Sequence, residues 1–314
     1  MSVAMIIGSE GQDGRLLRER LERDGGAVVG IDQAVARDPS GIGIGPVDIL
    51  DPQAVAAAVE KAQPAEVYYL AAFHHSAEDQ PPPTDLEAME KSLAVHVRGL
   101  LHFLEAIRQK SPRSRLFYAA SSHVFGQTSQ VPQNEDTPIR PGCVYGITKA
   151  AGLHCCRFYR ERHAVAASVG ILYNHESPLR GEAFVAQKIV RGAIRIQRGE
   201  QSRLVLGDLS ARVDWGYAPD YVDAMTRILR LGEGGEFVVA TGQAHTVQEF
   251  VETAFGLLGL DWKRHVEVKP SILAKRKLDL VGDASRLRRL TGWKPTVDFP
   301  EMVRLLLRGA GGAV

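Results

Sequence analysis

Short apolar runs alternate with amphipathic segments along the first half of the chain. Strands buried on both faces of a parallel sheet form nearly continuous apolar runs, whereas surface helices repeat apolar residues every three to four positions. We therefore predict strands at Val3–Ile7, Ala27–Ile31, Glu66–Ala71 and Arg115–Ala120, and helices at Arg15–Arg23, Pro52–Ala62 and Leu86–Gln109. This alternation predicts an α/β fold with a doubly wound parallel sheet between helices.

The pattern becomes irregular beyond about residue 172. Helices are predicted at Phe184–Arg198, Asp220–Leu231, Val247–Leu258 and Pro300–Arg308, with short strands near Leu204 and Phe237. Glycine and proline predict loops at residues 41–46 and 81–83. We expect residues 1–172 to form the first domain. Residues 173–314 should form mainly a smaller α/β substrate lobe, with some segments returning to the first domain.

Composition excludes several classes of function. The 314 residues include 38 Lys+Arg and 37 Asp+Glu, and the net charge of +1 is too small to hold nucleic acid or an anionic membrane. No apolar run approaches the ~20 residues of a membrane span, so we expect a cytoplasmic protein. The three cysteines match neither a disulfide framework nor a metal-ligand spacing, and we expect no metal.

A glycine-rich turn follows the first predicted strand. Gly8, Gly11 and Gly14 form G-x-x-G-x-x-G at the opening of a helix, where glycine lets the backbone approach a pyrophosphate. This position between strand and helix predicts a dinucleotide-binding, Rossmann-type sheet. Asp32 ends the second strand, 18 residues after Gly14, and a carboxylate there binds ribose hydroxyls and repels a 2′-phosphate. We therefore expect NAD as the cofactor.

Asp48 closes a further predicted short strand, Val47–Ile49, and is expected to meet the adenine edge. The whole cofactor site is assigned to Gly8, Gly11, Gln12, Asp13, Gly14, Asp32, Asp48, Leu70, Ala71, Ala72, Tyr145 and Lys149.

Three residues in the middle of the chain form a candidate catalytic group. Tyr145 and Lys149 are four residues apart on a predicted helix and so share one face. An ammonium beside a phenol favours phenolate, so we expect the pKa of Tyr145 to fall from its usual ~10. Ser121 stands at a strand end and is expected to hydrogen-bond the same substrate oxygen. Together with the glycine turn, these residues predict hydride transfer coupled to movement of a hydroxyl proton.

These motifs resemble the extended short-chain dehydrogenase/reductase family, and within it the GDP-mannose 4,6-dehydratases. The resemblance covers nearly the whole chain. It is strongest at residues 8–14, at 170–188 with Asn-His-Glu-Ser-Pro-Leu-Arg-Gly-Glu at 174–182, at 207–216 with 220–225, and at Trp293-Lys294-Pro295.

The resemblance implies a nucleotide-linked hexose as substrate. In that family the cofactor takes hydride from sugar C4, a glutamate helps to eliminate water across C5 and C6, and the hydride returns to C6. Tyr145 then corresponds to the base, Lys149 to its helper and Ser121 to the family's threonine, while Asn174 and Lys188 match residues that bind the nucleotide diphosphate. Catalysis is assigned to Ser121, His123, Tyr145 and Lys149, and substrate binding to His74, Ser122, Asn174, Glu182, Val185, Lys188 and Arg212.

Four positions depart from the family pattern. His123 replaces the dehydrating glutamate, although an imidazole also moves protons near neutral pH. Val213 replaces an arginine that binds the diphosphate, and its neighbour Arg212 should point to the opposite face of a strand. The cluster at residues 274–277 replaces an Arg-Pro-x-Glu run, and Asp32 stands where the dehydratases usually carry an arginine for NADP.

Other residues extend this interpretation. His74 and His75 follow a strand at the expected border of the sugar pocket, whereas the adjacent His175 and Glu176 cannot both face one metal ion. The helices at Leu86–Gln109 and around Tyr145 have wide apolar stripes. In the resembled family two such helices pair across a dimer as a four-helix bundle, and we expect a homodimer of this kind.

We thus predict an NAD-dependent enzyme that oxidises a nucleotide-linked hexose at C4, with 4,6-dehydration as the outcome. The replacement of glutamate by His123 leaves a 4-epimerase or a 4-ketosugar reductase as alternatives, and the Val213 replacement leaves a sugar phosphate or free glycoside as substrate. A non-catalytic NAD(H)-binding scaffold is the alternative of another class, against which the intact Ser121, Tyr145 and Lys149 argue.

Overall fold

A seven-stranded sheet forms the centre of the larger of two bodies. The computed structural model describes residues 2–33, 36–37, 41–74, 83–269 and 280–313. The strand order is β10-β6-β5-β4-β1-β2-β3, and every neighbouring pair is parallel except β2 and β3. The strands are β1 (Val3–Ile7), β2 (Ala27–Ile31), β3 (Ala36–Arg37), β4 (Glu66–Tyr69), β5 (Arg115–Ser121), β6 (Ala166–Leu172) and β10 (Gly235–Val239). The predicted doubly wound α/β fold is confirmed.

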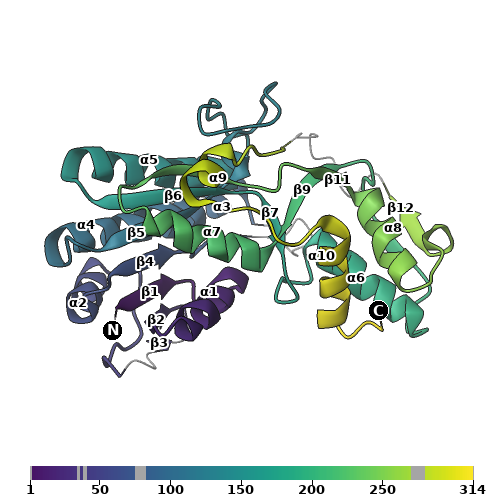
Figure 1. The fold of residues 1–314 in the computed structure, drawn as a ribbon, viewed down its shortest axis with the longest axis horizontal. Coiled ribbons are helices and arrows are strands. Elements are labelled where there is room, and N and C mark those ends of the chain that lie inside the picture. The colour runs from purple at the N-terminus through teal and green to yellow at the C-terminus, as the bar shows by residue number, and fades with distance from the viewer. Residues whose placement is uncertain (1, 34–35, 38–40, 75–82, 270–279, 314) are drawn as a thin grey trace.

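Helices cover both faces of this sheet (Figure 1). They are α1 (Gln12–Arg23), α2 (Pro52–Ala62), α4 (Leu100–Lys110), α5 (Val144–His163) and α7 (Ala218–Arg230). Helix α1 packs beside α7, whereas α2 packs on α4 and α4 on α5. The order of the strands reverses between β1 and β4, and ligands bind at the carboxyl ends of the strands at such a switch point.

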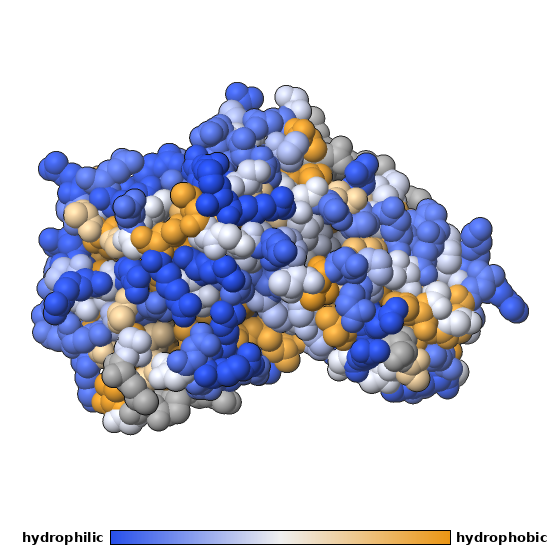
Figure 2. All heavy atoms as spheres, viewed as in Figure 1, coloured by the Kyte–Doolittle hydropathy of each residue, from blue (hydrophilic) through white to orange (hydrophobic). Residues whose placement is uncertain are grey.

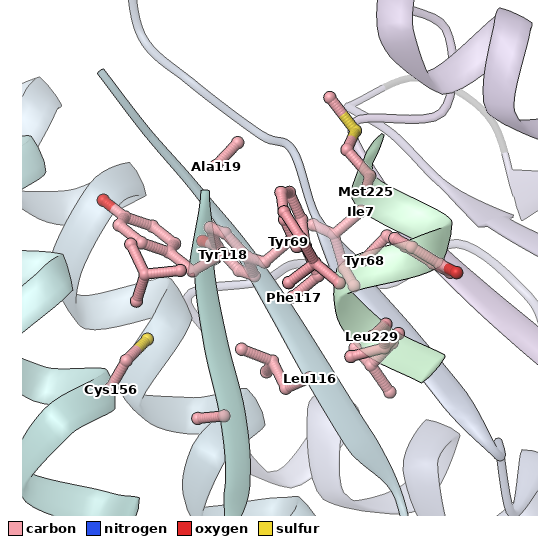
Figure 3. Packing of buried hydrophobic residues seen from close by; sticks show 14 of the residues in the cluster. Ile7, Tyr68, Tyr69, Leu116, Phe117, Tyr118, Ala119, Cys156, Met225 and Leu229 are labelled. Atoms are coloured by element: carbon pink, nitrogen blue, oxygen red, sulfur yellow. The ribbon is translucent and has the colours of Figure 1, made fainter. Parts of the chain in front are cut away.

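Aromatic side chains of neighbouring strands form the centre of the core (Figure 3). Tyr68 pairs with Phe117 across β4 and β5, and both extend toward Leu229 of α7. The next pair, Tyr69 and Tyr118, extends to the other face because successive strand residues alternate.

The long helix predicted at Leu86–Gln109 is interrupted in its middle. Helix α3 (Asp85–Leu93) begins at a capping box between Thr84 and Glu87, and a π-helical stretch, Ala94–Gly99, joins it to α4. The hydroxyls of Tyr69 and Tyr118 donate to the carbonyl oxygens of Val95 and His96 in this stretch. The wider π-helical turn therefore lies directly against the core tyrosines.

A second, smaller body lies beside the first (Figure 1), and it has its own hydrophobic core. It contains the strands β7 (Asn174–Glu176), β8 (Leu204–Leu206), β9 (Arg212–Tyr217), β11 (Ala244–Thr246) and β12 (Val266–Val268) and the helices α6 (Val185–Gln197), α8 (Val247–Leu257) and α10 (Phe299–Gly309). Strands β11, β9 and β7 form one sheet, and β12 pairs with β8. A short 3-10 turn occurs here at Trp262–Arg264, and another, at Ser122–Val124, follows β5 in the larger body. Figure 2 shows that the outline of the molecule is indented between the two bodies.

Parts of the second half of the chain belong to the larger body. Strand β10 pairs with β6 at the edge of the large sheet. Helix α7 contributes Tyr221 to the first core, and the short α9 (Ser285–Thr291) and the segment after it contribute Leu287 and Trp293. The second half is therefore divided between the two cores.

The prediction of a strand at Val47–Ile49 was wrong. This segment has no strand pairing, and the carboxylate of Asp48 instead accepts the N–H of Leu50 in a turn. Conversely, β6 was not among the predicted strands, although Ser168 is the only polar side chain among its seven residues. Both cases depend on whether a partner strand lies alongside, which apolar pattern alone does not determine.

Candidate active site

A cavity of about 1850 Å³ lies along the carboxyl ends of β1, β4 and β5. It exceeds the 300–1,000 Å³ usual for a single small-molecule site, so it has room for two ligands side by side. Sixteen of the predicted site residues line it: Gly8, Gly11, Gln12, Asp13, Gly14, Asp32, Asp48, Leu70, Ala71, Ala72, His74, Ser121, His123, Tyr145, Lys149 and Asn174.

The glycine turn forms one end of the cavity. Gly8 has φ of +88°, and a Cβ there would lie 2.8 Å from the backbone nitrogen of Ala71. A Cβ on Gly14 would lie 2.2 Å from the carbonyl oxygen of Gly8, so glycine is required at both positions. Gly11 caps α1 and, being glycine, offers its first-turn N–H groups no side-chain oxygen. These N–H groups lie at the cavity wall and suit a phosphate.

Asp32 lies beside this turn at the end of β2. Its carboxylate accepts the backbone N–H groups of Glu10 at 2.9 Å and Gln33 at 2.8 Å, which fixes its position at the cavity wall. A fixed negative charge here accepts hydroxyl hydrogen bonds and disfavours a phosphate. The turn and Asp32 thus fit a dinucleotide without a 2′-phosphate.

A buried ion pair joins the turn to the second body. The Nε2 atom of His175 lies 2.9 Å from a carboxylate oxygen of Asp13, and its Nδ1 lies 2.7 Å from the carbonyl oxygen of Tyr173. Both ring nitrogens therefore donate, which describes an imidazolium. Burial by itself lowers the pKa of His175, but Asp13 outweighs it and the pKa is raised. The ring also stacks on Tyr221 at 4.5 Å.

The catalytic group lies at the other end of the cavity. Lys149 is 1% exposed, and its Nζ donates to the carbonyl oxygen of Ala119 at 2.7 Å. The same Nζ lies 5.7 Å from the centre of the Tyr145 ring. Ser121 ends β5 two residues beyond Ala119 and accepts the N–H of His123. The structure thus brings Ser121, Tyr145 and Lys149 together, as their positions in the sequence predict.

The expected lowering of the Tyr145 pKa was wrong. Burial raises the pKa of Tyr145 to about 12, although the charge of Arg180 acts in the opposite direction. Burial also lowers the pKa of Lys149 to about 7. Desolvation disfavours both charged forms, and it outweighs the attraction between ammonium and phenolate on which the expectation relied. The lysine therefore exchanges its proton near neutral pH.

His96 in the π-helical stretch is a functional candidate that the sequence analysis missed. Its Nε2 accepts the N–H of Phe73 at 3.0 Å, so the neutral ring carries its proton on Nδ1, 2.8 Å from the hydroxyl of Thr148. Burial lowers the pKa of His96 to about 2. The ring stands edge-on to Tyr145 at 5.3 Å. The pattern of its helix gave no sign of this contact, because it depends on the packing of three separate segments.

Two further imidazoles border Tyr145. The ring of His74 lies 5.7 Å from it and that of His123 lies 6.1 Å from it, and both line the cavity. His75 lies outside the described residues, as do Lys275 and Arg276.

Arg180, Phe184 and Cys143 also line the cavity although no site role was predicted for them. The guanidinium of Arg180 lies 3.7 Å from the centre of the Phe184 ring and 3.8 Å from the buried carboxylate of Glu176. Burial raises the pKa of Glu176 to about 6. Arg180 lies within residues 174–182, one of the segments that most resemble the family, and this resemblance was the one sign in the sequence that it belongs to the site.

Five predicted substrate residues lie outside this lining. Ser122 is buried in the turn after β5, and Arg212 is exposed on β9. Glu182 pairs with Arg191 at 3.1 Å, while Val185 and Lys188 lie on the first turns of α6. Val213 packs against the second core, whereas its neighbour Arg212 is exposed to solvent, so the two side chains point to different faces as predicted.

In the part of the chain that the structure describes, no three His, Cys, Asp or Glu side chains are grouped so as to hold a metal ion. None of the helices within the described residues combines the length and the apolar character of a membrane span.

The family model described as GDP-mannose 4,6 dehydratase matches residues 5–306. GDP-mannose 4,6 dehydratase 2 of Arabidopsis thaliana is 37% identical over 97% of this chain and 86% of its own length. The GDP-mannose 4,6-dehydratase of Sinorhizobium fredii is 35% identical over 98% of this chain and 95% of its own length.

Solved structures share the fold. UDP-glucose 4-epimerase of Thermus thermophilus in complex with NAD has a TM-score of 0.80 and 25% identity, covering 99% of this chain and 100% of that one. RMD from Pseudomonas aeruginosa complexed with NADPH has a TM-score of 0.84 and 22% identity, covering 99% of both chains.

Proposed function

The chain belongs to the GDP-mannose 4,6-dehydratase family of extended short-chain dehydrogenase/reductases, and from this premise we propose that it oxidises a nucleotide-linked hexose at C4 with NAD. The resemblance drawn from its motifs is confirmed. One observation carries the proposal: Ser121, Tyr145 and Lys149 lie in the same cavity as the glycine turn and Asp32.

The residues of the turn fit the proposed cofactor. The open N-terminus of α1 at Gly11 would hold the pyrophosphate, Asp32 the adenosine ribose, and Lys149 the ribose nearest the reaction. When bound, NAD supplies an acceptor for the hydride that leaves the sugar carbon.

The chain's own residues would move the proton of the sugar hydroxyl. Ser121 orients the hydroxyl, and Tyr145 takes its proton as the hydride departs. Because the pKa of Lys149 is about 7, this ammonium passes protons to and from the site at neutral pH. Burial raises the pKa of Tyr145 to about 12, so its phenol is protonated at neutral pH and would pass this proton to the neutral amine of Lys149 as it takes the proton of the sugar hydroxyl.

The fate of the ketone depends on His123. A ketone at C4 acidifies the proton on C5, and His123 is a cavity residue able to remove it. We infer 4,6-dehydration of GDP-mannose as the outcome, in keeping with the curated relatives. An epimerase or reductase is the second candidate, because those reactions need no base at C5.

The test is incubation of the purified protein with NAD and GDP-mannose, followed by mass spectrometry of the product. We expect the loss of one water. Unchanged mass with an altered sugar identifies an epimerase, and a requirement for added NADH identifies a reductase. No change with any nucleotide sugar would contradict the proposal. Two comparison substrates test what the site recognises. UDP-glucose carries a different nucleotide and sugar, and mannose 1-phosphate lacks the nucleotide diphosphate.

We also propose a homodimer through α3 and α5. Leu86 and Leu93 on α3 and Ile147 and Phe158 on α5 are exposed, and Leu86 is 67% exposed. The two leucines are two helical turns apart, and Ile147 and Phe158 three turns apart, so each pair lies on one face. Phe158→Glu should give a monomer in sedimentation analysis, whereas Leu290→Glu on α9 should not.

A further inference from the structure

A thiol and an imidazole meet at the substrate end of the cavity. The Sγ atom of Cys143 lies 3.8 Å from Nδ1 of His123, within hydrogen-bond distance for sulfur. Cys143 also caps α5, because its sulfur accepts the N–H of Gly146 at 3.4 Å. Both residues line the cavity, and Tyr145 follows Cys143 by two positions. The thiol is thus held at a fixed place beside the catalytic tyrosine.

A thiol can donate to an imidazole nitrogen and can also accept from it. When S–H donates to Nδ1, the neutral ring carries its proton on Nε2. When Nδ1–H donates to sulfur, Nε2 is unprotonated and acts as a base. A carboxylate at the same place would accept only and would hold the ring in the second form.

We propose that Cys143 is a positioning residue that holds His123 beside Tyr145 and lets its ring alternate between these two forms. This inference rests on the proposed function and deepens it, because it assigns the proton transfer after C4 oxidation to the pair Cys143 and His123. Tyr145 and Lys149 then serve only the oxidation.

The proton balance of the step is closed. His123 takes the proton from C5, and the electron pair of that C–H bond forms the C5–C6 double bond as the C6–O bond breaks. The departing oxygen takes the proton from the imidazolium and leaves as water. When C6 later receives the hydride, C5 takes a proton that His123 has drawn from solvent, and this is the proton that D2O labels. Cys143 donates to Nδ1 or accepts from it during the cycle. At the end, the thiol and the imidazole have the same protonation as at the start.

The test separates oxidation from proton transfer in Cys143→Ala and Cys143→Ser. Reduction of NAD by GDP-mannose in a single turnover measures oxidation, and deuterium incorporation from D2O into the product measures proton transfer at carbon. Cys143→Ala should slow deuterium incorporation by about tenfold or more while NAD reduction stays within about twofold. A serine hydroxyl also donates and accepts, so Cys143→Ser should restore deuterium incorporation to within about threefold of the native rate.

A matched control is available on the same helix. Cys155 is half-buried, and the described lining of the cavity does not include it. Cys155→Ser should therefore leave both rates unchanged.

A second measurement tests the pair without any turnover. Iodoacetamide should alkylate the exposed Cys143 before the half-buried Cys155 and the buried Cys156. Alkylation should be slower in His123→Asn, because the imidazole that hydrogen-bonds the thiol is then missing.

Native deuterium incorporation in Cys143→Ala would overturn the inference. An equal loss of both rates in Cys143→Ala that serine does not restore would also overturn it, since this would be a general disturbance of the site. If the native protein reduces no NAD with any nucleotide sugar, the proposed function fails. In that case equal alkylation of Cys143 in the native protein and in His123→Asn separately overturns the pair itself.

Discussion

The ammonium of Lys149 donates a 2.7 Å hydrogen bond to the carbonyl oxygen of Ala119. This contact fastens the first turns of α5 to the end of β5, where Ser121 lies. A buried lysine with a backbone partner cannot swing out to solvent, so the two elements that carry the catalytic residues are held in register. The following predictions depend on this arrangement.

Tyr145→Phe should lower the rate of NAD reduction by about 10²- to 10⁴-fold, because only the proton-accepting oxygen is removed. The ring and its edge-on contacts with His74, His96 and His123 remain. Affinity for NAD, measured by fluorescence titration, should change by less than about threefold. Retained turnover would show that another group takes the hydroxyl proton.

Lys149→Met should abolish activity yet stabilise the cofactor-free protein. The pKa of Lys149 is about 7 in the folded state and 10.5 in the unfolded state. Between these values the unfolded chain binds more protons, so the free energy of unfolding of the native protein rises with pH. We expect the variant to be more stable by roughly 1–3 kcal/mol near pH 6, with a gap that narrows toward about pH 10. Urea unfolding at several pH values measures this, and a constant gap would contradict the assignment.

The pair of Asp13 and His175 should stabilise the protein in a limited pH window. Because the pKa of His175 is raised on folding, this residue adds to the free energy of unfolding. The addition is full below its unfolded pKa of 6.5 and is lost as the pH rises through its folded pKa. Because the pKa of Asp13 is lowered on folding, this residue also adds to the free energy of unfolding. Its addition is present above the unfolded pKa of 3.8 and is lost as the pH falls through the folded pKa.

His175→Phe, which keeps a ring against Tyr221, should therefore cost roughly 3–5 kcal/mol near pH 6, because the largely buried carboxylate of Asp13 loses its partner. The double variant with Asp13→Asn should lose less than the sum of the single losses in a double-mutant cycle. Additive losses would mean that the two groups do not interact.

His96→Leu should destabilise the protein and slow turnover together. The ring links the N–H of Phe73 to the hydroxyl of Thr148, which donates to the carbonyl oxygens of Val144 and Tyr145. Leucine removes the imidazole nitrogen that accepts the part-buried N–H of Phe73, at a cost of about 1–3 kcal/mol in unfolding free energy. Thr148→Val, which removes only the far end of this chain, should cost less. A fully stable and active His96→Leu would exclude a positioning role.

Asp32→Asn should weaken the discrimination between NAD and NADP. Asparagine keeps one oxygen to accept the N–H of Glu10 but removes the charge that repels a 2′-phosphate. We expect the ratio of the two dissociation constants to fall by about tenfold, which corresponds to ~1.4 kcal/mol. An unchanged ratio in calorimetric titrations would place the selectivity elsewhere.

The sequence by itself determined those features that depend on neighbouring residues. The glycine turn was recognisable because close approach between Gly8 and Gly14 involves one strand, one turn and one helix. Tyr145 and Lys149 share a face because four residues make about one helical turn. Continuous apolar runs were sufficient to locate β1, β2, β4 and β5.

Only the tertiary structure decided which distant side chains meet. Asp13 and His175 are 162 positions apart, and Cys143 and His123 are 20 apart on different elements. Burial of the site likewise reversed the expected pKa of Tyr145, since desolvation is set by everything packed around a group. Local propensity fixes turns and periodicity within a few residues, whereas contacts between segments and the dielectric around them are set by how the two cores pack.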